Sequence, residues 1–136
     1  MDINLLCGER QINVTVPDGS IVLDPAADMA LTDPEAAVKE SITNPIGTAP
    51  LSELAKGKKD ACIVISDVTR PVPNATLLPP ILETLEKSGI ERDKIKILIA
   101  TGMHRPNEGA ELEGMVGKHI MDNYTIINHF CRKEGD

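Results

Sequence analysis

The sequence predicts an α/β fold, a Rossmann-like parallel sheet with flanking helices and an N-terminal β-hairpin. After residue 50, short strands that are apolar at nearly every position alternate with helical segments, which is typical of βαβ units. Before residue 50, apolar and polar residues alternate on both sides of a glycine turn, as in a half-exposed hairpin. We therefore expect a single domain over 1–136, with the hairpin and first helix in 1–50 and a βαβαβ core in 51–136.

The first block begins with the hairpin. Ile3–Cys7 and Gln11–Val16 lie on either side of the turn Gly8-Glu9-Arg10, and the alternation in the second segment indicates a strand with one wet face. A Pro-Asp-Gly turn follows, after which Ile21–Leu23 predicts one more short strand.

The first helix is predicted from its start signal. Thr32–Glu35 reads Thr-Asp-Pro-Glu, which combines a capping box from Thr to Glu with a proline in the first turn. Pro45 and Gly47 should end this helix.

Three apolar strands are expected in the second block, at Asp60–Ser66, Lys94–Ala100 and Tyr124–Asn128. Their uninterrupted apolar character favours strands covered on both faces, as in parallel sheets, and predicts a buried Cys62 in the first of them. Crossover connections should make the three strands parallel neighbours.

Two helices should connect these strands. The first has leucines and isoleucines at helical spacing up to Leu85, with Gly89 as its stop and Pro79 and Pro80 in its first turn. The second should begin near Asn107 and include Leu112, Met115 and Val116.

Composition excludes several functions. The net charge is −7 and the only aromatic residues are Tyr124 and Phe130, so neither a phosphate-backbone surface nor a base-stacking surface is expected. No segment is apolar for long enough to span a membrane, and no secretory signal is visible, so we expect a cytoplasmic protein. The three distant cysteines fit neither a disulfide framework nor a metal knuckle.

Polar residues follow all three strands, where an open α/β sheet binds its ligands. They are Asp67, Thr69 and Arg70 after the first strand, Gly102, His104 and Arg105 after the second, and His129 after the third. A guanidinium binds a carboxylate through two parallel hydrogen bonds, and an imidazole exchanges protons near neutral pH. These residue types therefore indicate a site for a small organic anion.

Ordinary structural roles would also explain these residues. Asp67 and Thr69 are of the type that bind the backbone N–H groups of their own loop. Arg70 alone would be a surface ion pair, and His104 alone a loop residue. From the residues themselves, the choice between catalysis and simple anion binding stays open.

The two loop motifs resemble the N-terminal domain of the nickel-dependent lactate racemase family. The similar residues are Ser66-Asp67-Val68-Thr69-Arg70-Pro71 with Leu78-Pro79-Pro80, then Ala100-Thr101-Gly102-Met103-His104-Arg105-Pro106, with Asn44-Pro45-Ile46-Gly47 upstream. The resemblance implies a racemase or epimerase of 2-hydroxy acids. In such enzymes a histidine removes the hydroxyl proton while the α-hydride moves to a nickel-pincer nucleotide, so that a planar 2-keto acid forms.

By this resemblance His104 is one of two acid/base groups, the second being a histidine outside this chain, and Arg70 binds the substrate carboxylate beside Asp67. Thr69, Gly102 and Arg105 would contact the cofactor, and the role of His129 is open. The tethering lysine and the nickel-ligating histidine would lie outside this chain, so no metal is expected within it, and we expect an N-terminal piece that is inactive alone. The alternatives are a non-catalytic module that binds a nucleotide or organic anion, and an interaction domain that docks with another domain or with itself.

Overall fold

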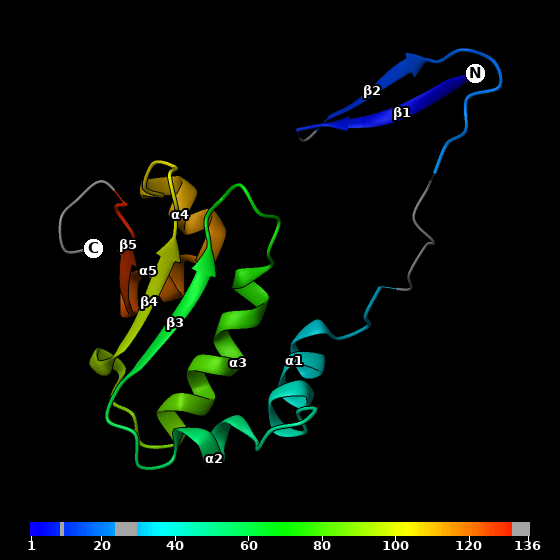
Figure 1. Ribbon diagram of the computed structural model, residues 1–136. Coiled ribbons are helices and arrows are strands. Elements are labelled where there is room, and N and C mark those ends of the chain that lie inside the picture. Colours follow the sequence, from blue (N-terminus) through cyan, green and yellow to red (C-terminus); the bar gives the residue numbers. More distant parts are fainter. Residues whose placement is uncertain (9, 24–29, 132–136) are drawn as a thin grey trace. The chain divides into compact units, whose positions relative to one another are not determined.

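The computed structural model describes residues 1–8, 10–23 and 30–131, and Figure 1 shows their secondary structure. They form two compact units, Met1–Ala30 and Leu31–Asp136, which are treated separately. The predicted α/β class, with an antiparallel hairpin and a parallel sheet flanked by helices, is confirmed.

The first unit is the hairpin of β1 (Asp2–Cys7) and β2 (Arg10–Thr15), which pair in antiparallel register from Asp2 opposite Thr15 to Cys7 opposite Arg10. Gly8 takes a φ of 61° in the turn, a conformation that glycine adopts without strain. Glu9 lies outside the described residues. The short strand predicted at Ile21–Leu23 is wrong, since these residues are not in a strand. They have β-propensity, but no described strand pairs with them.

The second unit contains a three-stranded parallel sheet in the order β3, β4, β5, and Figure 1 shows the strands running in one direction. Its elements are α1 (Pro34–Thr43), α2 (Leu51–Ala55), β3 (Ala61–Ser66), α3 (Asn74–Lys87), a 3-10 turn (Arg92–Lys94), β4 (Ile95–Ala100), α4 (Gly109–Val116), α5 (Lys118–Asn123) and β5 (Thr125–Asn128). All three carboxyl ends therefore meet at one edge of the sheet.

The start of α1 differs in detail from the prediction. Asp33, not Thr32, is the N-cap, and its Oδ1 accepts a hydrogen bond of 2.9 Å from the N–H of Ala36. Pro34 occupies the first helical position, which fixes the cap one residue before it. The helix ends at Thr43, ahead of Pro45 as predicted.

The helices between the strands also begin elsewhere than predicted. α3 starts at Asn74, so Pro79 and Pro80 lie inside the helix and not in its first turn. Each proline removes one helical N–H donor, and the burial of Leu78 in the core, on the same turn, offsets this loss through packing. The next helix, expected near Asn107, is two helices, α4 and α5, with Gly117 between them at a φ of 85°.

One face of the sheet packs on the helices. Ile95, Ile97 and Ile99 of β4 are fully buried in a single cluster with Leu78, Leu82 and Leu85 of α3, Val116 of α4 and Ile120 of α5. Alternate residues of a strand point to opposite faces, so this cluster occupies only one side of the sheet.

The other face is open, so the prediction of a sheet covered on both sides is wrong for the described residues. Val64, Leu98 and Ile127 are paired across the three strands, and Val64 is 62% and Ile127 41% exposed. Cys62 lies on this face and is exposed, contrary to the predicted burial. None of the described helices is long and apolar enough to cross a membrane.

The two faces of the sheet should respond differently to truncation. We expect Ile97→Ala to lower the free energy of unfolding by about 2–5 kcal/mol, because the deletion leaves a cavity in a closed core. The control Val64→Ala, on the open face, should lower it by about 1 kcal/mol or less. Urea denaturation measures both values, and equal losses would contradict the one-sided core.

Candidate active site

The loop after β3 begins with a buried acid. Asp67 is only 5% exposed, and its Oδ1 accepts hydrogen bonds from the Thr69 hydroxyl at 2.6 Å and from the Thr69 N–H at 3.2 Å. The Arg70 N–H donates to the Asp67 carbonyl at 3.1 Å, which closes a β-turn from Asp67 to Arg70. Asp67 therefore binds groups of its own loop, as expected for an acid in a turn. These hydrogen bonds use only one of its two carboxylate oxygens.

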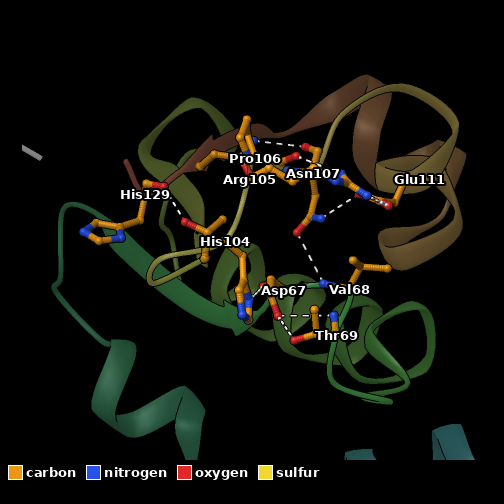
Figure 2. A network of polar contacts seen from close by, with 11 residues as sticks. Asp67, Val68, Thr69, His104, Arg105, Pro106, Asn107, Glu111 and His129 are labelled. Atoms are coloured by element: carbon orange, nitrogen blue, oxygen red, sulfur yellow. Dashed lines mark hydrogen bonds and ion pairs between the residues drawn. The ribbon is translucent and has the colours of Figure 1, made fainter. Parts of the chain in front are cut away.

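The other carboxylate oxygen contacts a histidine from the next loop. Nδ1 of His104 hydrogen-bonds Oδ2 of Asp67, as Figure 2 shows. The His104 side chain is 53% exposed, and its backbone N–H donates to the Thr101 carbonyl at 3.0 Å. A buried acid and a half-exposed imidazole from adjacent strand ends are thus in direct contact.

The electrostatics of this pair fix the direction of the hydrogen bond. The Thr69 hydroxyl, followed by His104, holds the pKa of Asp67 below its ordinary value, and outweighs the opposing effect of burial. An ionised carboxylate only accepts hydrogen bonds, so Nδ1 of His104 carries the proton and Nε2 is left to accept one. This arrangement leaves Nε2 of the neutral ring as the nitrogen that can accept a proton.

Arg70 lies beside this pair but faces another space. It lines a cavity of about 380 Å³ together with Val72, Asn74, Glu111 and six other residues, and neither Asp67 nor His104 belongs to that lining. Among the described residues, its guanidinium has no hydrogen bond or ion pair. The guanidinium is therefore free to bind an anion at the edge of the cavity.

Arg105 is engaged differently. Its two terminal nitrogens bind the two carboxylate oxygens of Glu111 at 2.8 and 2.7 Å. Arg105, and then Asn107, lower the pKa of Glu111 to about 2. Gly102 is exposed at a φ of 58°, and the Thr69 hydroxyl is bound to Asp67. Cofactor contacts by these residues stay a prediction.

Two buried or half-buried amides that the sequence reading missed join the loops. Asn107, expected only as a helix start, bonds to Val68, Glu111 and Asn128. In the sequence, these two amides are marked only by the Pro106-Asn107 pair and by the position of Asn128 at the end of a predicted strand. His129 contributes its backbone, which accepts a hydrogen bond from Thr101, and its ring points away from Asp67 (Figure 2).

Metal binding is the remaining question for this site. In the described part of the chain, no group of three or more His, Cys, Asp and Glu side chains is placed to hold a metal ion. The described residues therefore do not by themselves assemble the donor set of a nickel site.

Thr69→Val should raise the pKa of Asp67 towards its ordinary value, because the strongest stabilising hydrogen bond is removed. A carbon-detected NMR titration of the Asp67 carboxyl group measures this shift. Since the pKa of Asp67 is lower in the folded than in the unfolded chain, its stabilising contribution is present above the unfolded-state pKa and is lost as pH falls through the folded-state pKa.

In Thr69→Val that acid-side loss should be smaller and should be complete at a higher pH, because the folded-state pKa lies closer to the unfolded-state value. The control is Thr43→Val, whose hydroxyl bonds only to the Lys39 carbonyl in α1; it should leave the Asp67 titration unchanged. An unaltered titration in Thr69→Val would contradict the role given to this hydroxyl.

Comparison with known proteins assigns this chain to a family. Residues 7–136 match the lactate racemase N-terminal domain. The chain is 37% identical over 131 residues to a lactate racemase of Lactiplantibacillus plantarum, which covers 93% of this chain and 31% of that protein. A lactate racemase of Thermoanaerobacterium thermosaccharolyticum is 41% identical over 98 residues, which are 72% of this chain and 23% of that protein.

The fold is similar as well. The structure of the lactate racemase apoprotein from Thermoanaerobacterium thermosaccharolyticum superposes with a TM-score of 0.77 at 33% identity, over 98% of this chain and 31% of that chain. The chain thus spans less than a third of the length of these relatives. With most of its length matched by the family and its parallel sheet reproduced in a solved member, this chain belongs to the lactate racemase N-terminal domain family.

Proposed function

We propose that this chain forms the proton-transferring and carboxylate-binding wall of a 2-hydroxy-acid racemase of the lactate type. The observation that carries the proposal is the contact between buried Asp67 and half-exposed His104. Membership of the lactate racemase N-terminal domain family supports the substrate class. Because the relatives are more than three times as long as the matched region, the complete activity would need residues beyond those described.

Substrate binding begins with the carboxylate. Arg70 is exposed and carries no ion pair within the described residues, so its guanidinium can take both oxygens of a carboxylate. It closes the β-turn that starts at Asp67, and the two Cα atoms of such a turn lie within about 7 Å of each other. In the proposed complex the guanidinium turns away from the cavity that it lines, so that a small 2-hydroxy acid bound to it directs its hydroxyl group towards His104.

The proton step follows from the orientation of the ring. Nε2 of His104 takes the hydroxyl proton as the carbon–oxygen bond gains double-bond character, and Asp67 stabilises the resulting imidazolium. The same nitrogen returns the proton when the hydroxy acid of the original hand re-forms, and the family resemblance implies a second histidine, outside the described residues, for the opposite hand. The family resemblance implies a nickel-pincer nucleotide as hydride acceptor, and we assign the hydride step to no described residue.

The proposal is tested in the polypeptide of the complete reading frame, loaded with cofactor. His104→Gln should lower kcat by about 10² to 10⁴, because the proton acceptor is lost. Arg70→Ala should raise KM for lactate strongly, because the carboxylate loses its cation. Racemisation is followed by chiral chromatography.

Lys118→Ala is the matched control, since within the described residues Lys118 forms its ion pair with Asp122 on the surface of α5. It should leave kcat and KM unchanged. Full activity in His104→Gln, or equal effects of Arg70→Ala and Lys118→Ala, would refute the proposal. Calorimetry on the 136-residue chain tests the alternative function, because tight binding of a nucleotide without racemisation would favour a binding module.

A further inference from the structure

The buried amide of Asn107 links the two loops that carry Asp67 and His104. Asn107 is 1% exposed. Its Oδ1 accepts a hydrogen bond of 3.3 Å from the N–H of Val68, the residue after Asp67, and its Nδ2 donates to Oε1 of Glu111 at 2.6 Å. Figure 2 shows Asn107 between Val68, in the loop after β3, and Glu111, in α4. Apart from the Asp67–His104 contact itself, this is a second hydrogen-bonded connection between the loops.

A second amide holds Asn107 from the end of β5. Oδ1 of Asn128 accepts a hydrogen bond of 2.8 Å from the Asn107 N–H, and its Nδ2 donates to the Asn107 carbonyl at 3.0 Å. At the other end of the same loop, the Thr101 hydroxyl donates to the carbonyl of His129. The segment from Thr101 to Asn107, which contains His104, is therefore fixed to the end of β5 at both of its ends.

Asparagine is the side chain that this position requires. The amide accepts from a backbone N–H and donates to a carboxylate at the same time. Aspartate would lack the donor and would place a second negative charge against Glu111. Leucine would leave the Val68 N–H without its acceptor and Oε1 of Glu111 without one of its donors. The amide does not cap α4, whose N-cap is Glu108 without a side-chain hydrogen bond.

We propose that Asn107, held by Asn128, is a positioning residue that sets the distance between the Asp67 and His104 loops and thereby the tautomer of His104. The proposal rests on the proposed function for its catalytic meaning. The Asp67–His104 contact is one hydrogen bond between two loops, and its geometry follows their relative position. Displacement of one loop by about 1 Å is enough to change a catalytic rate by about 100-fold.

The test measures the His104 ring directly in the 136-residue chain. Long-range nitrogen–proton NMR spectra at a pH where the imidazole is neutral report which ring nitrogen carries the proton. The unaltered chain should show the proton on Nδ1. In Asn107→Leu and Asn107→Asp, part of the population should instead carry the proton on Nε2. The circular dichroism spectrum and the amide chemical shifts of the sheet should stay unchanged.

Asn123→Leu is the matched control, because the Asn123 amide bonds only to His119 within α5. It should leave the His104 spectrum unaltered. If the Asn107 variants do not fold, Asn128→Asp provides the second case, since it keeps the acceptor for the Asn107 N–H and removes the donor to its carbonyl. Folded variants that keep the proton on Nδ1 would overturn the proposal.

Two further measurements separate this proposal from the function on which it rests. Hydrogen exchange of the Val68 N–H in the unaltered chain should be at least about tenfold slower than in an unstructured peptide, and an unprotected N–H would overturn the Asn107 link without any variant. In the complete enzyme, Asn107→Asp should lower kcat by about 10- to 100-fold with little change in KM. Full racemisation in His104→Gln would refute the proposed function but would not alter the tautomer result.

Discussion

Parallel pairing of β3, β4 and β5 is the constraint on which the site depends. In the observed register Ser66 pairs with Ala100, and Ile99 with Asn128, so the three strands end almost level with one another. The residues that follow each strand consequently meet at one edge, as ligand sites do in open α/β sheets. A slip of one position in either pairing would also exchange the buried and open faces, and the single isoleucine row in the core opposes such a slip.

Two carboxylates at this edge are kept ionised by different means. Asp67 is buried and relies on the Thr69 hydroxyl and on His104, whereas Glu111 relies on Arg105 and Asn107. Asp67 in turn raises the pKa of Glu111, although the effect is the weakest of those acting on it. Because Arg105 neutralises Glu111, Arg70 is left as the cation beside the cavity that can meet an incoming anion. An acidic chain thus leaves a guanidinium without an ion pair beside this cavity, within the described residues.

The sequence was sufficient to predict the sheet and the loops that carry the site, because apolar runs and strand order depend on local pattern. It predicted the boundary of α3 wrongly, because whether Pro79 and Pro80 are tolerated inside a helix depends on the packing of Leu78. The links made by Asn107 could not be predicted, since its partners lie 39 and 21 residues away. The burial of Cys62 was also wrong, because apolar composition does not tell which face of a strand the described helices cover.

The exposure of His104 limits what these residues can do alone. About half of its side chain meets water, whereas the proposed racemisation would need a site from which water is excluded, both to strengthen the electrostatic contacts and to prevent side reactions. The Asp67 contact orients the ring but does not shield Nε2. Arg70 is exposed as well, beside an open cavity. A wall that closed over both groups would desolvate the carboxylate contact and the proton acceptor together, and would strengthen both through the same fall in local dielectric constant.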